Sequence, residues 1–332
     1  MTQCIYYPNC RNLTFEKAEH AIPAGIGGQK TLPKGYVSDQ FNNEFSKIEL
    51  GFMRESIIAM PRQLLGPGKR GKTNPRYATR SEVLLVSQPG PPEQLSLGYL
   101  SLAKAIHLPQ IHLNLQTGEI DWSLPADVGT SDPDLYLLNL LDQYTIFKIR
   151  YISSHRLPPG KIIIGFREHL YIAQSDGSTF ELNAEIIADL KTAILNSSRT
   201  YNALRQPVQF NQTALIADDF YRVTAKTALN TLALLKGKDL VFGSEFDKIR
   251  HYITEGGANP GVTYIKTPSK MPQFPPDSHQ IIIAKSDKKL AAVIQFYNHF
   301  SVSVILSHDF HGAFDPEVYC CDWRNKIEGR LR

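Results

Sequence analysis

The chain has 332 residues, a formal net charge of +4, 42% hydrophobic residues and 20% charged residues. This composition excludes a wholly disordered chain, and the length predicts two domains, or one domain with an appended module. No run of 18 apolar residues occurs, and the first ten residues lack the pattern of a signal peptide. We therefore expect a soluble, cytoplasmic protein with no membrane partner.

The four cysteines are too few for a disulfide scaffold in a chain of this length. Cys320 and Cys321 are adjacent, which makes a bond between them unfavourable. We expect reduced thiols.

The first 60 residues predict a short strand, a loop and a helix. Residues 17–30, KAEHAIPAGIGGQK, contain one proline and three glycines, which favour a loop after a strand. Residues 36–60 carry apolar side chains at helical spacing, with Ser38 as the expected N-cap and Asp39 in the first turn. Asn42 then lies near the start of this helix.

Positive charge is concentrated in the first 90 residues, which hold twelve Lys and Arg against seven Asp and Glu. The densest part is GPGKRGKTNPRYATR, where glycines and prolines prevent a regular helix. Four of its side chains are candidates for contacts with a nucleic-acid phosphate backbone: Lys69, Arg70, Lys72 and Arg76. A loop that is merely solvated explains this segment equally well.

The rest of the chain mixes strands and helices. The prolines of residues 87–96 predict a linker. Beyond it the patterns predict a hairpin over 111–122, helices over 184–198, 221–237 and 244–256, and an antiparallel meander over 280–306. The expected fold class is therefore α+β, and the expected domains are residues 1–60, a basic segment and linker over 61–96, and a larger mixed domain over 97–332 that could recognise a target.

The Glu19-His20 pair combines a hard oxygen ligand for Mg²⁺ with a base whose unperturbed pKa lies near neutrality. An amide oxygen from the following helix would complement the carboxylate in a metal site, and Asn42 is placed to supply it. The alternative is that Asn42 and Asn43 only cap the helix start.

EHAIPAGIGGQK followed by SDQFNNEFSKIE resembles the HNH endonuclease family, in the subgroup with an EH-I-P…GG segment and a CxxCN-type helix start. The resemblance covers about residues 1–60. It implies a ββα-metal finger in which Glu19 binds one Mg²⁺ or Mn²⁺ ion, His20 is the general base and Asn42 is the last metal ligand, with Asn43 as the alternative. It also implies a nucleic-acid substrate, DNA in the first place and RNA as an open alternative.

The chain departs from this subgroup at its structural zinc site. Of the four cysteine positions, Cys4 is kept, while Tyr7, Ser38 and Phe41 stand at the others. A zinc site needs four good donors, so we expect no structural zinc and expect packing of Tyr7 and Phe41 to stabilise this region instead. A rebuilt site from Cys4, Cys10, Cys320 and Cys321 is an alternative. The family's middle Asn has no evident match between residues 26 and 40.

The sequence thus predicts a metal-dependent HNH endonuclease that hydrolyses phosphodiester bonds. One alternative is a catalytically inactive HNH-like module that binds nucleic acid or is structural. Another is a different metallohydrolase built from four residues near the C-terminus: His308, Asp309, His311 and Asp315. The GPGKRGKT segment lacks the spacing of a phosphate-binding loop, which argues against nucleotide hydrolysis.

Overall fold

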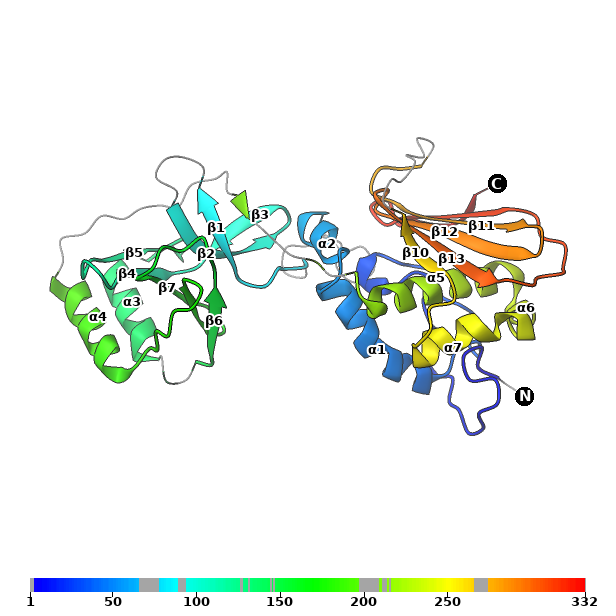
Figure 1. Cartoon of the computed structure of the whole chain (residues 1–332), viewed down its shortest axis with the longest axis horizontal. Coiled ribbons are helices and arrows are strands. Elements are labelled where there is room, and N and C mark those ends of the chain that lie inside the picture. The colour runs from blue at the N-terminus through cyan, green and yellow to red at the C-terminus, as the bar shows by residue number, and fades with distance from the viewer. Residues whose placement is uncertain are drawn as a thin grey trace. The chain divides into compact units, whose positions relative to one another are not determined.

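The chain folds into two compact units of helices and antiparallel or mixed sheets, which confirms the α+β class (Figure 1). Unit 1 comprises Met1–Thr79 and Ala214–Arg332, and unit 2 comprises Arg80–Thr213. The computed structural model describes residues 3–65, 78–88, 94–125, 128–130, 132–143, 145, 147–196, 209–210, 214, 216–265 and 274–331.

This division differs from the expected one. Strand β1 (Leu84–Gln88) pairs antiparallel with β2 (Gln94–Ser101), and Gln88 lies opposite Gln94. The proline-rich stretch therefore connects two paired strands along the chain. Its prolines fall between Gln88 and Gln94 in the sequence and are not part of either strand. The region after residue 96 also does not form one unit, since its C-terminal part shares a hydrophobic core with the N-terminal residues.

Unit 1 is built on a six-stranded antiparallel sheet in the order β10-β13-β12-β11-β14-β15. Its strands are β10 (Val262–Ile265), β11 (His279–Ser286), β12 (Lys289–Phe296), β13 (Phe300–Ser307), β14 (Glu317–Asp322) and β15 (Ile327–Leu331). The sequential pairing of β11, β12 and β13 confirms the predicted meander.

The helical elements of unit 1 come from both ends of the chain. They are η1 (Ala24–Ile26), α1 (Asp39–Arg54), α2 (Ala59–Leu65), α5 (Asp218–Lys236), α6 (Lys238–Val241), η5 (Ser244–Phe246) and α7 (Asp247–Glu255). As predicted, the Ser38 side chain caps α1 by accepting a hydrogen bond from the Phe41 N–H. Gly237, with φ of 89°, ends α5 at the expected residue.

Helix α5 is the centre of unit 1. Every residue from Val223 to Ala233 is buried, because α1 packs on one side and the sheet on another. Phe52 of α1 contacts both Phe220 of α5 and Phe296 of β12, with ring centroids 5.8 and 5.6 Å apart. The buried threonine hydroxyls of α5 donate to carbonyl oxygens one turn earlier, so their burial leaves no donor unsatisfied.

Two side chains of the sheet hold the loop that precedes α1. The buried His279 imidazole accepts a hydrogen bond from the Tyr297 N–H at Nδ1, so Nε2 carries the proton and donates to the Ile26 carbonyl at 2.8 Å. The Glu328 carboxylate accepts from the N–H groups of Gln29 and Lys30. The loop over residues 24–30 is thereby fixed to β11 and β15.

The described residues of unit 2 form two sheets and two α-helices. Its five-stranded sheet, in the order β5-β4-β7-β8-β6, carries α3 (Pro133–Asp142) and α4 (Ala184–Asn196) on one face. The strands are β4 (Gln110–Asn114), β5 (Ile120–Ser123), β6 (Ile149–Ser153), β7 (Lys161–Phe166) and β8 (Leu170–Gln174), and β6 and β8 are parallel.

The second sheet of unit 2 has the order β3-β2-β1-β9, with β3 at Lys104–His107 and β9 at Gln209–Phe210. The predicted hairpin over 111–122 is confirmed by the antiparallel pairing of β4 and β5. Among the helices of the described residues, none combines the length and apolar character that crossing a membrane requires.

His279 makes unit 1 sensitive to acid. Burial lowers its pKa from 6.5 to about 4, so the unfolded chain binds a proton that the folded chain does not between these pH values. The free energy of unfolding should therefore fall as the pH drops from 6.5 to 4, by up to about 3 kcal/mol from this group. His279→Gln keeps one donor and one acceptor but cannot titrate.

Denaturant unfolding measured at several pH values checks this expectation. A Trp122→Phe background leaves Trp323, which belongs to unit 1, as the single tryptophan. The loss of stability on acidification should be smaller in the Gln variant than in the parent. Equal pH dependence in both proteins would contradict the assignment.

Candidate functional site

The Glu19-His20 segment forms a short antiparallel pair with residues 30–32. His20 and Thr31 are bridge partners, the Leu32 N–H donates to the Glu19 carbonyl at 2.7 Å, and the Ala21 N–H donates to the Lys30 carbonyl at 3.0 Å. The chain between them forms the loop with η1, and α1 follows after a few residues. The candidate residues therefore lie at the base of a closed loop.

Two glycines of this loop are required by close contacts. A Cβ at Gly28 would lie 1.9 Å from the Ile22 carbonyl oxygen, and one at Gly27 would lie 2.4 Å from Cβ of Trp323. Gly27 also has φ of 110°. The glycines thus let the loop fold tightly on itself and against the sheet.

The Glu19 carboxylate is held by a lysine of the central helix. The ammonium of Lys226 contacts Glu19 Oε1 and lies 2.6 Å from Glu49 Oε1 on α1. The side chain of Lys226 is 4% exposed, that of Glu19 13% and that of Glu49 21%, so the three charges are largely withdrawn from water. The ammonium also lies 5.1 Å from the centroid of the Phe45 ring.

The three charged groups do not neutralise one another completely. Burial raises the pKa of Glu19, Lys226 opposes this effect, and Glu49 reinforces it. For Lys226, burial acts to lower the pKa, but the two carboxylates together outweigh it and keep the pKa above the usual value for lysine. When all three groups are ionised, the cluster carries a net charge of −1, which favours a cation nearby.

The backbone of His20 is held by a side chain of α5. Its carbonyl accepts a hydrogen bond from Nδ2 of Asn230 at 3.0 Å, and Asn230 Oδ1 accepts from the Tyr6 hydroxyl at 2.5 Å. Asn230 lies one turn after Lys226 on α5. The same face of α5 therefore holds both candidate residues of the Glu-His pair.

Asn42 lies in the first turn of α1, two helical turns before Glu49 and so on the same side of the helix. Its side-chain carbonyl oxygen is buried and has no hydrogen-bond partner among the described residues. Asn43, the alternative ligand, is exposed. A buried amide oxygen without a partner is costly unless something satisfies it, which favours Asn42 over Asn43 as a ligand.

The donors present fit a hard divalent ion. Carboxylate and amide oxygens are the protein ligands that Mg²⁺ and Mn²⁺ prefer, and Glu19 and Asn42 offer one of each. Lys226 competes for the Glu19 carboxylate, while the charge of Glu49 offsets part of its ammonium charge. A divalent ion held by these two groups would take its other ligands from water and a phosphate group.

The four positions where the HNH subgroup carries zinc ligands lie close together. The Ser38 N–H donates to Cys4 Sγ at 3.4 Å, and the rings of Tyr7 and Phe41 meet edge to face at 5.7 Å between centroids. Phe41 also stacks on Tyr6 with centroids 3.9 Å apart. Aromatic packing thus fills the region as the sequence predicted.

The alternative metal sites are not assembled. Among the described residues no group of three or more His, Cys, Asp and Glu side chains is placed to hold an ion. His308 Nε2 lies 3.0 Å from the Pro260 carbonyl, whereas His311 Nε2 lies 3.2 Å from an Asp309 carboxylate oxygen. Three or more of the four cysteines likewise do not come together within the described residues.

The four basic candidates, Lys69, Arg70, Lys72 and Arg76, lie outside the described residues. The sequence analysis missed Glu49, Lys226 and Asn230. Lys226 and Asn230 interrupt the apolar pattern of VTAKTALNTLALL, which is a signal for buried polar groups with a partner elsewhere. Nothing in the sequence identifies that partner as Glu19, more than 200 residues away.

No protein-family model, no curated protein and no solved structure matches this chain.

Breaking the ion cluster should destabilise unit 1. Lys226→Met leaves two largely buried carboxylates without their cation, and loss of one partner from a buried pair typically costs about 3 to 5 kcal/mol. Adding Glu49→Gln should restore part of the loss, because it removes one of the two unpaired charges. Lys47→Met, at an exposed position of α1, is the matched control and should stay within about 0.5 kcal/mol of the parent.

Unfolding in guanidinium measures the free energy of unfolding of the parent, the Lys226→Met protein, the double variant with Glu49→Gln, and the Lys47→Met control. A Lys226→Met protein as stable as the Lys47→Met control would show that the cluster contributes nothing to the fold.

Proposed function

We propose that unit 1 is a metal-dependent endonuclease of the HNH type that hydrolyses phosphodiester bonds of DNA. His20 is the general base, and Glu19 and Asn42 are the protein ligands of one Mg²⁺ or Mn²⁺ ion. The observation that carries the proposal is the buried Asn42 Oδ1, which lacks a hydrogen-bond partner in the described part of the chain. The bridge at His20 followed by α1 supports a finger of the ββα kind.

The chemistry requires a neutral imidazole. His20 accepts a proton from a water molecule, the water oxygen attacks the phosphorus atom in line, and the bond to the leaving oxygen breaks. When bound, a divalent ion would stabilise the negative charge that develops on the phosphate and the leaving oxygen. No covalent bond between enzyme and substrate forms in this scheme.

Residues of α5 position the reacting groups. Lys226 fixes the direction of the Glu19 carboxylate, and Asn230 fixes the backbone of His20. Because α5 starts at residue 218, the proposed site depends on both segments of unit 1. Residues 1–60 alone would lack these supports.

The contact between Lys226 and Glu19 also favours a second candidate function. An ammonium beside two carboxylates can take the electrostatic place of a divalent ion. In that case the finger is catalytically inactive and serves as a nucleic-acid-binding or structural module. The two candidates differ in one measurable property, which is cleavage that depends on a divalent ion.

His20→Ala should reduce nicking of supercoiled plasmid DNA by about 10² to 10⁴-fold while DNA affinity changes little, because a general base acts in the chemical step. Glu19→Gln and Asn42→Ala should raise the Mg²⁺ concentration needed for half-maximal cleavage. Asn43→Ala is the matched control for Asn42 and should leave the metal titration unchanged.

Nicking assays over a range of Mg²⁺ concentrations, with a parallel RNA substrate, make this measurement. Absence of metal-dependent cleavage by the parent protein would favour the inactive module. Cleavage that is equal in the parent and the His20 variant would refute the role of His20.

The basic residues give a separate prediction about binding. If Lys69, Arg70, Lys72 and Arg76 contact phosphates, replacing all four with Gln should weaken binding to unrelated duplexes about equally. The slope of log affinity against log salt should become shallower by roughly 0.9 for each lost contact, or about 3 to 4 in total. Fluorescence anisotropy at several salt concentrations measures the slope, and an unchanged slope would exclude this segment as the binding surface.

A further inference from the structure

Unit 2 has a row of polar side chains on the face of its five-stranded sheet that points away from α3 and α4. The side chains of β4 and β5 alternate between the two faces of the sheet. Ile111, Leu113 and Trp122 lie on the face that packs against the helices. His112 and Asp121, which are direct cross-strand neighbours, therefore lie on the opposite face. A polar face beside an apolar core needs either water or a ligand to satisfy it.

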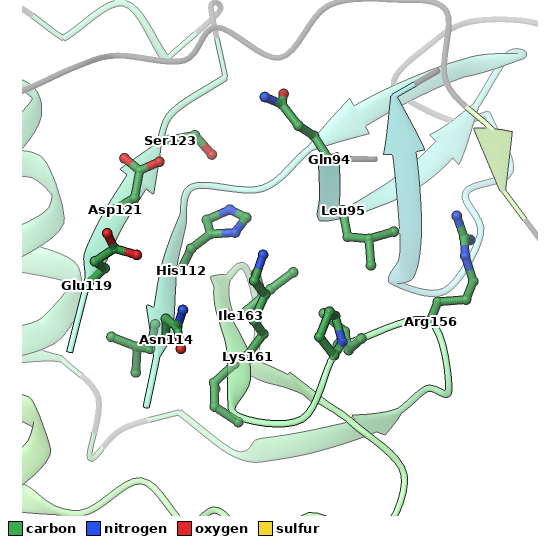
Figure 2. A pocket seen from close by; sticks show the side chains of 14 residues that line it. Gln94, Leu95, His112, Asn114, Glu119, Asp121, Ser123, Arg156, Lys161 and Ile163 are labelled. Carbon is green, nitrogen blue, oxygen red and sulfur yellow. The ribbon is translucent and has the colours of Figure 1, made fainter. Parts of the chain in front are cut away.

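A cavity of about 420 Å³ opens over this face. Its floor is formed by side chains of β4, β5 and β7, and its far side by the first residues of β2 and the loop after β6. Figure 2 shows Asp121, Ser123 and His112 around one side of the cavity and Arg156 on the opposite side. This volume lies in the range of small-molecule sites, about 300 to 1,000 Å³.

One buried group in the cavity lacks a partner. Ser123 is 3% exposed, lines the cavity, and its hydroxyl oxygen has no hydrogen-bond partner among the described residues. Burial lowers the pKa of the neighbouring His112 to about 4, so its imidazole is neutral at pH 7 and offers one donor and one acceptor. Both groups suit a ligand with hydroxyl groups.

The charges of the cavity are balanced and separated. Asp121 lies on β5 and Lys161 on β7, with β4 between them and an offset of two residues along the strands, so their backbones are about 12 Å apart. Arg156 adds a second cation at the rim and donates a 2.7 Å hydrogen bond to the Ser87 hydroxyl. A polyanion would be repelled by the carboxylates Asp121 and Glu119, whereas a cation would be repelled by Lys161 and Arg156.

The apolar part of the lining is aliphatic. Leu95, Leu157, Pro158 and Ile163 line the cavity between the charged groups. Such a surface suits the carbon ring of a ligand rather than an extended polar chain. The cavity therefore combines acceptors for hydroxyl groups, an apolar surface for a ring, and cations for one compact anion.

We propose that this cavity binds a phosphorylated sugar, with the hydroxyl groups of the sugar toward Asp121 and Ser123 and the phosphate toward Lys161 and Arg156. The same chemistry occurs in a free sugar phosphate and in the ribose phosphate of a mononucleotide. The proposal is independent of the function proposed for unit 1, because all of its residues belong to unit 2.

Isothermal titration calorimetry on the full chain tests it with four probes: ribose 5-phosphate, AMP, inorganic phosphate and adenosine. Ribose 5-phosphate and AMP should bind, and inorganic phosphate and adenosine should each bind at least about tenfold more weakly, because each presents only part of the required chemistry. Tighter binding of AMP than of ribose 5-phosphate would identify the mononucleotide as the source, and comparable binding would identify the sugar phosphate.

Substitutions in the lining test whether the probes bind in this cavity. Lys161→Met changes an exposed side chain and should weaken binding of the phosphorylated probes about tenfold, as should Asp121→Asn. Lys104→Met and Asp176→Asn, at exposed positions of unit 2 outside the cavity, are the matched controls and should bind as the parent does. Ser123→Ala should weaken the sugar-containing probes and leave inorganic phosphate unaffected.

Failure of both phosphorylated sugars to bind the folded parent protein would overturn the proposal. Binding that the Lys161 and Asp121 variants retain in full would overturn it as well.

Discussion

The ammonium of Lys226 links α5 to two separate parts of the N-terminal segment. It lies in the interior between carboxylates from the N-terminal segment and from α1, and it belongs to a helix that starts at residue 218. Taking three charges out of water is unfavourable unless they compensate one another closely. The pair of Glu19 and Lys226 therefore fixes where two distant parts of the chain meet, and it sets the charge beside the candidate site.

The loop next to the site is held from two directions. On one side, Asn230 of α5 binds the backbone of His20. On the other, His279 binds the Ile26 carbonyl, and Glu328 binds two consecutive backbone N–H groups. A loop that is fixed at both ends and along its length holds its side chains in place before any ligand arrives, which is the condition that a metal site or a general base requires.

The two units carry polar sites of different kinds. Unit 2 has hydrophobic clusters of its own, separate from the one that joins the N-terminal and C-terminal segments of unit 1. The candidate site of unit 1 is a small set of buried charges held by helices, whereas the cavity of unit 2 lies on a sheet face with charges spaced across three strands. For the first we propose a metal ion and a phosphodiester, and for the second a compact organic ligand.

Local patterns in the sequence determined most of the elements. The N-cap at Ser38, the end of α5 at Gly237, the hairpin of β4 and β5 and the meander of β11 to β13 all follow from side-chain period and turn residues, which act over a few positions. The α+β class followed from the same patterns. Glu19, His20 and Asn42 could be selected because they lie within 24 positions of one another in a recognisable spacing.

The tertiary structure alone decided which segments share a core and which charges meet. The prolines of residues 87–96 predicted a linker between domains, whereas the strands on either side of them are paired. A proline-rich stretch can have the same composition in both situations. Lys226 and Glu328 reach the candidate loop from far along the chain, and the pairing of a buried charge depends on packing rather than on its neighbours in sequence. Burial and long-range charge compensation are properties of the folded chain, so no local pattern could reveal them.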